Sequence, residues 1–296
     1  MNNKFTDRQQ KLLDKLSAAA KWPKRKHLVR LLAHPRKMLY PKVLKVIRRS
    51  KEVEARTFWG GEITVILPED VSIYIWRYGY FEEDVCIYLL SLLQEGMTFL
   101  DIGSHFGFFT LLGSHLVGEN GKVLAFEPTP NTYRQLQKNV ANCPNVDVYN
   151  CAAYSVDEKI RFYDYGLTES AFNSVFGPRK DNKTPMPKSE ITVQARKIDS
   201  ILMEMGSKKI DLVKIDVESS EINVLKGMME TLKGFRPNLV LEVGDFEVNG
   251  ASNSRDVVRL LVQMNYLAYE ISGEKIVPHL LEERYGHSNL LFLANR

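Results

Sequence analysis

The sequence predicts an α/β fold in which helices cover both faces of a mainly parallel sheet. From residue 97 onward, short apolar runs alternate with longer segments whose apolar residues repeat at helical spacing. This alternation is typical of βαβ units, in which a helix connects one strand to the next parallel strand. A second observation is the segment FLDIGSHFGFFT, where an apolar run passes through a glycine turn, Gly103 to Gly107, into a helical segment. Nucleotide-like ligands bind at turns of this kind.

The short apolar runs and the segments of helical spacing place each strand and each helix of the predicted domain. Strands are expected at 97–102, 122–127, 145–151, 210–217, 237–243, 265–271 and 288–294. Helices are expected at 105–117, 130–141, 219–233 and 253–264. The last strand follows its predecessor closely, which favours an antiparallel orientation for it. Residues 158–198 interrupt the alternation with a predicted hairpin and a polar loop that contains prolines.

The first 51 residues differ from the rest of the chain in charge. They contain 16 Lys and Arg against two acids, a net charge of +14 in a chain of net charge +4, which leaves −10 for the remainder. Apolar residues at helical spacing predict short helices here, separated by Pro23, Pro35 and Pro41. A hairpin around Gly60 and Gly61 follows, and then a helix. The predicted parts are a basic helical extension at 1–54, a hairpin and helix at 55–96, and the main domain at 97–296.

A strongly basic segment predicts an anionic partner. On an anionic membrane each nearby Lys or Arg contributes about 1 kcal/mol, and interleaved apolar residues insert into the interface. The interleaved apolar residues are Trp22, Leu28, Leu31, Leu32, Met38, Leu39 and Tyr40. Nucleic acid attracts the same charge, but the sequence contains no recognisable base-reading fold. A third interpretation is that the segment docks on the acidic remainder of the chain.

The composition also bears on where the protein works. Cys86, Cys143 and Cys151 have no metal-type spacing and leave an odd thiol, which favours a reduced setting. No run approaches the roughly 20 apolar residues that a membrane span needs, and the N-terminus is too charged for a secretory signal. We therefore expect a cytoplasmic protein, placed peripherally at the inner membrane face if the basic segment binds lipid.

The glycine turn favours a ligand without phosphate. A dinucleotide fingerprint needs Gly-x-Gly-x-x-Gly so that the backbone passes close to a pyrophosphate, whereas this turn has only Gly103 and Gly107. Asp101, at the end of the preceding strand, would repel a phosphate and attract a cation. S-adenosylmethionine carries an ammonium and a sulfonium and no phosphate, so it matches this acid. A dinucleotide oxidoreductase is accordingly disfavoured.

The second predicted strand ends at Glu127, 20 residues after Gly107. A carboxylate in this place accepts hydrogen bonds from both hydroxyls of a ribose. Phe126 and Pro128 flank it and would supply apolar surface for an adenine. For Glu127 alone, a solvated acid at a strand end is an equal alternative, but its spacing from Asp101 and the two glycines favours the ligand.

The segment DLVKIDVESSEINVLKG, residues 211–227, carries a second group of charged residues. Lys214, Asp216 and Glu218 alternate with apolar residues near the carboxyl end of the predicted strand. Charges at the end of a buried strand are costly unless they are paired or used in binding. They form either a Lys–carboxylate pair at the start of the next helix or part of a ligand site. The ligand site is favoured because crevices at the carboxyl ends of parallel strands hold ligands.

These segments together resemble the FkbM family of S-adenosylmethionine-dependent methyltransferases. FLDIGSHFG is similar to the family's Asp-x-Gly-Ala-Asn-x-Gly turn, and AFEPTPNTYRQLQKNV is similar to its Phe-Glu-Pro motif and following helix. DLVKIDVESSEINVLKG resembles the Lys-x-Asp-x-Glu-Gly-x-Glu signature, the most distinctive of the three. PNLVLEV and HSNLLF match in kind, so the resemblance extends over roughly residues 75–294.

The resemblance implies a class I methyltransferase (Rossmann-like) sheet of seven strands, mainly parallel, with an antiparallel last strand. Together with the residues derived above, it gives a predicted cofactor-binding set of Asp101, Gly103, Ser104, His105, Gly107, Phe126, Glu127, Pro128, Ala152, Ala153 and Asp216. The sequence departs from the family at Ser104 and His105, where Ala-Asn is usual, and at Ser219, where Gly is usual. His105 would change a polar contact to the cofactor, and Ser219 would narrow the space beside the reactive methyl group.

The activity implied by the resemblance is O-methyl transfer from S-adenosylmethionine to a hydroxyl of a sugar or related natural product. A base that takes the hydroxyl proton adds about 10²–10⁴-fold to such a rate. The predicted catalytic residues are Asp216, Glu218, Glu242 and His287. We favour Asp216 as the base, and Asp216 and Glu218 would be the ligands of Mg²⁺ if the reaction uses it. The polar, aromatic loop at 163–190 suits either a carbohydrate acceptor or an ordinary exposed surface.

Two other functions fit the same residues. An RNA methyltransferase recruited by the basic extension would show salt-sensitive RNA binding and a methylated RNA product. A scaffold that binds S-adenosylmethionine without turnover is the other alternative. The complete set of Asp101, Glu127, Asp216 and Glu218 argues against the scaffold.

Overall fold

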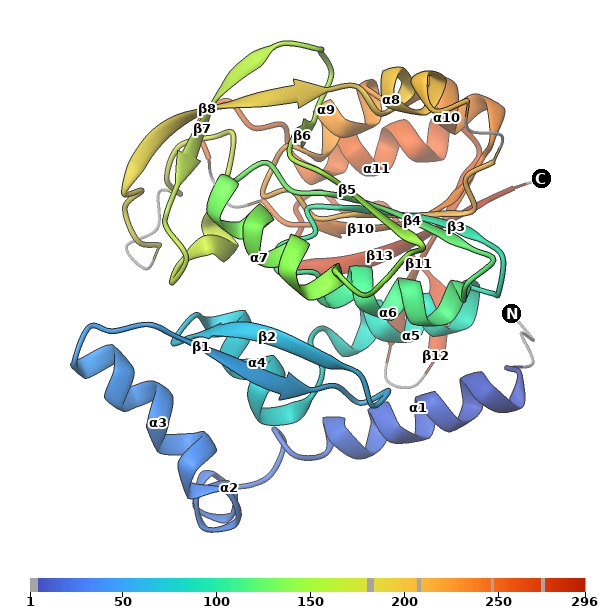
Figure 1. The fold of residues 1–296 in the computed structure, drawn as a ribbon. Coiled ribbons are helices and arrows are strands. Elements are labelled where there is room, and N and C mark those ends of the chain that lie inside the picture. Colours follow the sequence, from blue (N-terminus) through green and yellow to red (C-terminus); the bar gives the residue numbers. More distant parts are fainter. Residues whose placement is uncertain (1–4, 180–183, 207–208, 246–247, 273–274, 296) are drawn as a thin grey trace. The chain divides into compact units, whose positions relative to one another are not determined.

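Figure 1 shows the computed structural model of the chain. The residues that it describes are 5–179, 184–206, 209–245, 248–272 and 275–295. They form two compact units, which we describe separately. The N-terminal unit comprises residues 5–91 and 166–171, and the sheet unit comprises residues 92–165 and 172–295.

The sheet unit is built on one large sheet. Its strands are β3 (Thr98–Ile102), β4 (Lys122–Phe126), β5 (Val146–Tyr149), β9 (Leu212–Ile215), β10 (Asn238–Val243), β11 (Tyr266–Ser272), β12 (Lys275–Pro278) and β13 (Ser288–Ala294). Within the described residues these eight strands lie in the order β12-β11-β13-β10-β9-β3-β4-β5. β3, β4, β5, β9 and β10 pair in parallel, and β13 pairs antiparallel with β10 and β11. The predicted mainly parallel sheet with an antiparallel final strand is confirmed.

β12 is an edge strand that the sequence pattern did not predict. It pairs antiparallel with β11, with Ser272 opposite Lys275. Only Ile276 and Val277 in its centre are partly buried. This apolar run is too short for periodicity to predict a strand. The sheet therefore has one strand more than the seven that the sequence predicted.

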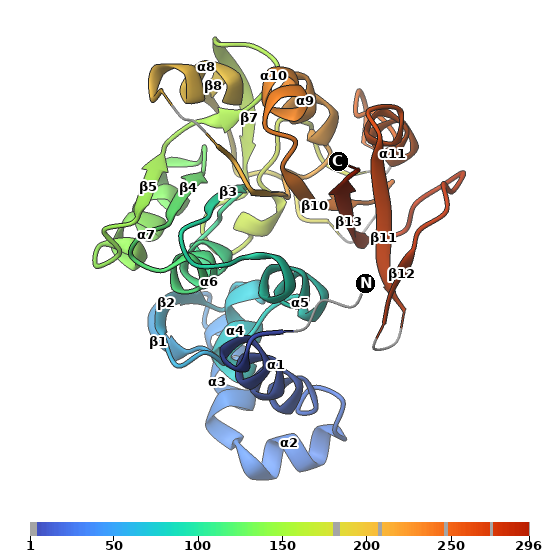
Figure 2. The ribbon, with the colours of Figure 1, turned by 90° about the vertical axis from the view of Figure 1, so that its right-hand side faces the viewer.

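Helices cover both faces of this sheet. α6 (Phe108–Val117) and α7 (Pro130–Val140) lie on one face, and the other face carries α8 (Ile198–Glu204), α9 (Glu221–Lys226), α10 (Met229–Gly234) and α11 (Ser254–Gln263), as Figure 1 and Figure 2 show. Leu100 of β3 and Val213 of β9 belong to one buried cluster with Leu261 of α11. Each buried side chain of this kind contributes about 1.5–3 kcal/mol to folding.

The helix predicted at 219–233 is divided into α9 and α10. The break falls at Gly227 and Met228. A Cβ on Gly227 would lie 1.9 Å from the carbonyl oxygen of Tyr154, so the chain passes here too closely for any side chain.

The strand order creates a switch point between β3 and β9. From β3 the chain moves outward to β4 and β5, and it later returns to β9 and continues the other way to β10. Such a reversal opens a crevice at the carboxyl ends of the two central strands. Asp101 in β3 and Asp216, just after β9, lie at this crevice.

A second, smaller sheet follows β5 in the same unit. β6 (Ala152–Ala153), β7 (Lys159–Asp164) and β8 (Ser189–Arg196) form it in the order β6-β8-β7. β7 and β8 pair antiparallel, which confirms the hairpin predicted within 158–198. The connection between them includes a short 3-10 helix, Ser170–Phe172, and residues 180–183 of the predicted polar loop lie outside the described residues.

The N-terminal unit combines short helices with a hairpin. Its elements are α1 (Asp7–Ala20), α2 (His27–Ala33), α3 (Pro35–Val46), β1 (Lys51–Arg56), β2 (Glu62–Leu67), α4 (Asp70–Tyr78) and α5 (Glu83–Leu92). β1 and β2 pair antiparallel and form the hairpin predicted around Gly60 and Gly61. The parts predicted as 1–54 and 55–96 thus lie almost entirely in one compact unit.

Pro41 does not separate two helices, because it lies inside α3. Proline lacks the N–H that would bond to the carbonyl oxygen four residues earlier, which here belongs to Lys37. The Nε of Arg77 donates to that oxygen at 2.9 Å, and its Nη2 donates to the oxygen of Met38 at 3.2 Å. A distant side chain therefore replaces the missing backbone bond and lets α3 continue.

α4 is the helix of this unit that the sequence pattern missed. It is capped by the Glu69 side chain, which accepts from the N–H groups of Val71 at 2.9 Å and Ser72 at 2.6 Å. Its C-cap, Gly79, has a left-handed φ of +77°. Glu is not among the strongly preferred N-cap residues, so this start gave no clear signal. Among the described residues, no helix is both long and apolar enough to cross a membrane.

Candidate functional site

The turn after β3 lies against the chain that leaves β9. Gly103 has φ +79°, a left-handed conformation that other residues rarely adopt. A Cβ on Gly103 would lie only 1.7 Å from the carbonyl oxygen of Asp216. Gly107 closes the turn with φ +92°, and a Cβ there would lie 2.7 Å from Leu136 Cδ1. Gly103 thus lets the chain after β3 meet the chain after β9, and Gly107 lets the turn pack against α7.

Asp101 carries a buried carboxylate at this meeting point. Its Oδ2 accepts a hydrogen bond from Thr110 Oγ1 at 2.5 Å. Its Oδ1 has no hydrogen-bond partner among the described residues and lies 3.8 Å from Lys214 Nζ. Burial raises the pKa of Asp101, and the Lys214 ammonium acts against this rise. A buried oxygen with unused acceptor capacity is suited to a cationic ligand.

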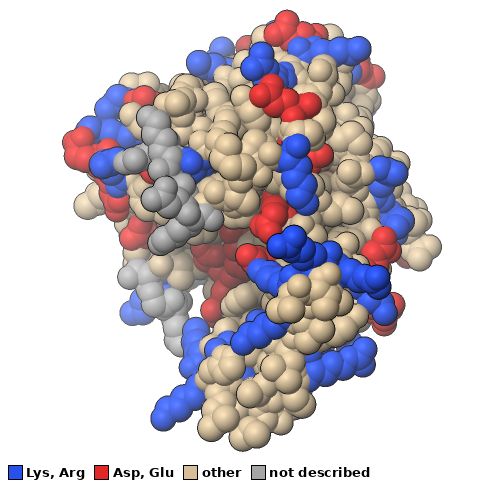
Figure 3. Space-filling view, turned by 90° about the vertical axis from the view of Figure 1, so that its left-hand side faces the viewer, with Lys and Arg blue, Asp and Glu red and all other residues tan. Residues whose placement is uncertain are grey.

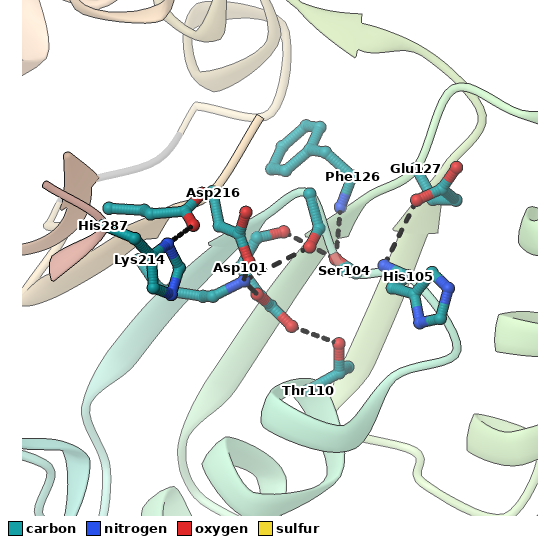
Figure 4. A network of polar contacts seen from close by, with 11 residues as sticks. Asp101, Ser104, His105, Thr110, Phe126, Glu127, Lys214, Asp216 and His287 are labelled. Carbon is teal, nitrogen blue, oxygen red and sulfur yellow. Dashed lines mark hydrogen bonds and ion pairs between the residues drawn. The ribbon is translucent and has the colours of Figure 1, made fainter. Parts of the chain in front are cut away.

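Lys214 links the two acids of the crevice. Its Nζ lies 3.0 Å from Asp216 Oδ2 and 3.3 Å from the carbonyl oxygen of Gly103. Burial acts against ionisation of Asp216, but Lys214 and a hydrogen bond shared with Glu242 outweigh it, so the pKa of Asp216 is lowered. Figure 4 shows Asp101, Lys214 and Asp216 clustered beside the turn. Asp216 is therefore an anion whose charge is held in place by a buried cation.

Glu127 is fixed at the end of β4 by backbone donors. Its Oε1 accepts from the N–H of Thr129 at 3.0 Å, and its Oε2 accepts from the N–H of His105 at 3.1 Å. Burial raises the pKa of Glu127 to about 7, against the effect of these hydrogen bonds. The carboxylate is thus held rigidly at the crevice, where a ribose would meet it.

His105 and Ser104 shape the turn from within. His105 has φ +49°, and burial lowers the pKa of its imidazole to about 4, so the ring is neutral. Ser104 Oγ donates to the carbonyl oxygen of Asp101 at 2.6 Å and accepts from the N–H of Phe126 at 3.0 Å. These bonds tie the turn to β4. The side chains at 104 and 105 thus stabilise the turn, and their contact with a cofactor stays a prediction.

Three other residues of the predicted cofactor set lie in packed surroundings. The Phe126 ring is buried and stacks on Tyr149 at 5.0 Å between ring centroids. Ala152 and Ala153 are buried in two hydrophobic clusters of the sheet unit. The predicted contacts of these three residues with an adenine stay predictions. Pro128 is half-buried beside Glu127.

Glu218 is joined to the loop between β7 and β8. Its carboxylate forms an ion pair with Arg179, and its carbonyl oxygen accepts from Ser174 Oγ at 2.8 Å. Burial raises the pKa of Glu218 to about 7, and Arg179 acts against the rise. In the same loop, Asn173 Nδ2 donates to Thr129 Oγ1 at 3.1 Å. The part of the loop at 173–179 is therefore attached to the ends of both β4 and β9.

The geometry gives no support to Asp216 and Glu218 as ligands of Mg²⁺, the role that they would have if the reaction used this ion. Lys214 lies on the Asp216 carboxylate, and Arg179 lies on that of Glu218. Each acid already has a protein cation as its partner, which leaves no need for a metal ion to compensate the two charges.

The remaining predicted catalytic residues meet at the end of β10. Glu242 Oε1 lies 2.7 Å from Nδ1 of His287, which stands just before β13. Glu242 is buried, whereas the His287 side chain is 56% exposed. Because Glu242 also shares a hydrogen bond with Asp216, the three residues form one chain of contacts. Glu218 is connected instead to Arg179.

A pocket of about 300 Å³ opens beside these strand ends. Its lining residues are Ser219, Gly244, Asp245, Val248, Ala251, Ser252, Asn253, Glu283 and Arg284. Ser219 and Gly244 follow shortly after Asp216 and Glu242, which places the pocket near the chain of contacts. Asp245 accepts from the N–H groups of Ser254 and Tyr285, each at 2.8 Å, and so fixes the pocket wall.

Several residues of the site escaped the sequence analysis. Thr110 binds Asp101, and its place in the first turn after Gly107 was an available signal. Asn150 donates to the carbonyl oxygens of Glu127 and Pro128, each at 2.9 Å. A polar residue at the end of a predicted strand could have revealed it.

The crevice fits S-adenosylmethionine. The unused Oδ1 of Asp101 provides an acceptor for an ammonium, and a Cβ at Gly103 would close the turn. Glu127 provides acceptors for ribose hydroxyls, while the acids disfavour a pyrophosphate. The chemistry of this donor and acceptor set therefore agrees with the predicted cofactor.

Comparison with known proteins identifies the family. The Methyltransferase FkbM domain model matches residues 101–269, more than half of the chain. The chain is 29% identical over 184 residues to the hexuronic acid methyltransferase AglP of Haloferax volcanii, which covers 61% of this chain and 67% of that protein. It is 28% identical over 192 residues to the 31-O-demethyl-FK506 methyltransferase FkbM of Streptomyces tacrolimicus, which covers 57% and 72%.

Among solved structures, the methyltransferase FkbM of Methylobacillus flagellatus KT is 16% identical, with 76% of this chain and 56% of that chain covered and a TM-score of 0.40. The family match confirms the predicted enzyme class and, with it, S-adenosylmethionine as the methyl donor. The chain belongs to the FkbM family of S-adenosylmethionine-dependent methyltransferases.

Proposed function

We propose that this methyltransferase acts on a hydroxyl group of a sugar or a related natural product. The observation that carries the proposal is the pair of Glu242 and His287, with 2.7 Å between Oε1 and Nδ1, at the end of β10. A hydroxyl acceptor must lose a proton, and this pair is built to receive one. A base in such a position raises the rate by about 10²–10⁴-fold.

When bound, S-adenosylmethionine supplies an activated methyl group whose leaving group is a neutral thioether. The protein therefore has to orient the acceptor hydroxyl and remove its proton. In the proposed arrangement Oε1 of the buried Glu242 accepts the Nδ1–H of His287, and Nε2 is the atom that takes the proton of the acceptor. Because the imidazole is more than half exposed, an acceptor can reach it from solution.

Asp216 is less suited to take the proton, although the sequence favoured it. Lys214 and Glu242 lower its pKa, and a carboxylate with a lowered pKa is a weak base. Its charge instead stands beside the glycine turn, where it complements a positively charged donor. We therefore propose Asp216 as the electrostatic group and His287 as the base.

The pocket lined by Ser219, Asn253 and Arg284 is the proposed acceptor site. Its volume of about 300 Å³ lies at the lower end of the range for small-molecule sites, which is about 300–1,000 Å³. Serine, asparagine, arginine and carboxylate groups in its walls match the hydroxyls and acids of a sugar. This chemistry agrees with the names of two relatives, a hexuronic acid methyltransferase and a 31-O-demethyl-FK506 methyltransferase.

The test is transfer of label from methyl-labelled S-adenosylmethionine to a methyl glycoside of a hexuronic acid, a neutral methyl hexoside and a short RNA. The enzyme is compared with His287→Gln and with His27→Gln, a control at an exposed histidine of α2. We expect label in a glycoside and normal turnover in the control. In His287→Gln we expect kcat to fall by at least about 10²-fold.

Each other outcome has a definite meaning. Label only in RNA would replace the sugar by a nucleic-acid acceptor. Normal turnover of the glycoside by His287→Gln would remove His287 from the role of base. Binding of S-adenosylhomocysteine by both variants, within about twofold of the unaltered enzyme, is needed to separate the chemical step from cofactor binding.

A further inference from the structure

The N-terminal unit contains a second pocket, of about 310 Å³. It lies among the end of α1, α2, the start of α3, β1 and the end of α4. Its basic lining residues are Arg30, His34, Lys37, Arg56 and Arg77, and none of its lining residues is Asp or Glu. A concave surface with this charge attracts an anion.

Among the described residues, no ion pair joins a Lys or Arg of this pocket to an acid. In the described part of the N-terminal unit, ion pairs join Lys24 to Glu83 and Lys45 to Asp70, and none involves a cation of the pocket. Burial lowers the pKa of Lys37, because its ammonium loses water without gaining a carboxylate. A bound anion would reverse this effect.

Arg30 provides a more specific sign of a missing ligand. Its Nη1 donates to the hydroxyl of Tyr78 at 2.8 Å, which fixes the guanidinium in the pocket wall. Its Nε is shielded from solvent and has no hydrogen-bond partner among the described residues. A buried donor without an acceptor is unfavourable, and an oxyanion in the pocket would supply one.

Exposed apolar side chains accompany the pocket on the same two helices, α2 and α3, and at the residue that follows α3. They are Leu28, Val29, Leu32, Leu39, Val43, Val46 and Ile47, of which Leu32 is 73% and Val46 is 82% exposed. Figure 3 shows Lys and Arg side chains around an uncharged area in its lower part, where these helices lie. Of the membrane-facing residues predicted from sequence, Leu28, Leu32 and Leu39 are exposed, whereas Met38 is buried.

We propose that the pocket binds the phosphate of an anionic phospholipid headgroup while the apolar side chains of α2 and α3 enter the membrane interface. The cations supply the donors for a phosphate, and the apolar residues favour a lipid over a polar nucleic acid. Arg56, Arg77 and Tyr78 belong to the pocket, so it extends beyond the basic segment 1–51. The proposal does not depend on the acceptor of the methyl group.

The test measures binding of the full chain to phosphatidylcholine vesicles that contain phosphatidic acid. Vesicles of equal negative charge made with a fatty acid separate phosphate recognition from charge alone. The pocket variant Arg30→Gln/Lys37→Gln is compared with Arg36→Gln/Lys42→Gln, which removes the same charge from exposed positions of α3. We expect the pocket variant to bind phosphatidic acid vesicles at least about tenfold more weakly, with a clearly smaller loss in the control.

A second variant tests insertion without altering the pocket. Leu28→Ser/Leu32→Ser changes only exposed side chains and should weaken vesicle binding while leaving the fold intact by circular dichroism. The proposal would be overturned in favour of diffuse attraction if the two charge variants lost equal vesicle affinity. It would also be overturned if the unaltered protein bound fatty-acid vesicles as tightly as phosphatidic acid vesicles. Two further results would also overturn it: binding of inorganic phosphate without any vesicle binding, and a preference for RNA over vesicles.

Discussion

The two sides of the crevice are built in different ways. On the cofactor side, the turn after β3 and the end of β4 hold their polar groups with nearby backbone donors, as in the bonds of Glu127 to Thr129 and His105. On the side proposed for the acceptor, the carboxylates bind side chains from distant segments: Glu218 binds Arg179 and Glu242 binds His287. The first construction is local and the second is assembled by the fold.

This difference separates what each side does. One rigid turn can bind a cofactor whose shape is the same in all relatives. An acceptor site built from loop residues can differ between relatives that share this turn. Ser219 illustrates this difference. It stands where the family usually has glycine, has a left-handed φ of +76° and lines the proposed acceptor pocket. Variants on the two sides should therefore affect different steps.

Gly103→Ala should have the largest effect, on the cofactor side. The new Cβ would lie 1.7 Å from a backbone oxygen, so the turn must open. We expect at least about 3 kcal/mol lower free energy of unfolding and no measurable binding of S-adenosylhomocysteine by calorimetry. Gly60→Ala is the matched control, since Gly60 has φ +94° but a Cβ there would meet no other atom within 4 Å, and it should cost only about 1 kcal/mol. Equal losses in both variants would mean that the close approach to β9 is unimportant.

Asp216→Asn should act on turnover and leave the affinity for S-adenosylhomocysteine, which lacks the positive sulfonium, largely intact. Asparagine keeps the shape of the side chain but removes the charge that Lys214 holds in place. We expect kcat to fall at least about tenfold, measured by methyl transfer, with S-adenosylhomocysteine binding preserved. Near-normal turnover would remove Asp216 from the catalytic centre, and loss of binding as severe as in Gly103→Ala would show that the two sides cannot be separated.

The stability of the protein should fall as the pH rises toward neutrality. Burial raises the pKa of Glu127 from its ordinary 4.5 to about 7. Between these values the folded state binds more protons than the unfolded state, so the free energy of unfolding decreases with increasing pH. The free energy of unfolding is measured by urea denaturation at about pH 5 and about pH 7.5. Glu127→Gln should reduce the difference between these two free energies by about 2 kcal/mol. Glu62→Gln, at an exposed position, should leave the difference unchanged, and an unchanged slope in Glu127→Gln would contradict the raised pKa.

Ser219→Gly should have the smallest effect and the opposite sign. Glycine relieves the strain of the left-handed conformation, and part of this gain is lost to the greater freedom of the unfolded chain. We expect the free energy of unfolding to rise by about 0.5–1 kcal/mol. Ser220→Gly, at φ −108°, is the control and should destabilise the protein. A loss of stability in both variants would show that Ser219 is not strained.

The arrangement of the residues on the proposed cofactor side could be predicted from the sequence because its geometry is local. Asp101, Gly103, Gly107 and Glu127 are spaced by one strand, one turn and one helix, and this spacing alone brings them to one edge of the sheet. The central strands were equally clear, because buried parallel strands are continuous apolar runs.

The acceptor side could be read only in part. The motif residues Asp216 and Glu218 stood out, but the ion pair of Glu218 with Arg179 depends on how a long loop folds back. The same holds for Arg77. Its side chain belongs to α4 and supplies the hydrogen bond that Pro41 cannot make within α3. No periodicity encodes such contacts between distant segments, because they follow from the tertiary fold.

The most direct test is calorimetric titration of S-adenosylhomocysteine into the unaltered enzyme, Glu127→Gln and His287→Gln. If the cofactor side and the acceptor side are separate, Glu127→Gln binds at least about tenfold more weakly and His287→Gln binds as the unaltered enzyme does. Unchanged affinity in Glu127→Gln, or an equal loss in His287→Gln, would contradict the division of the crevice on which the proposed function rests.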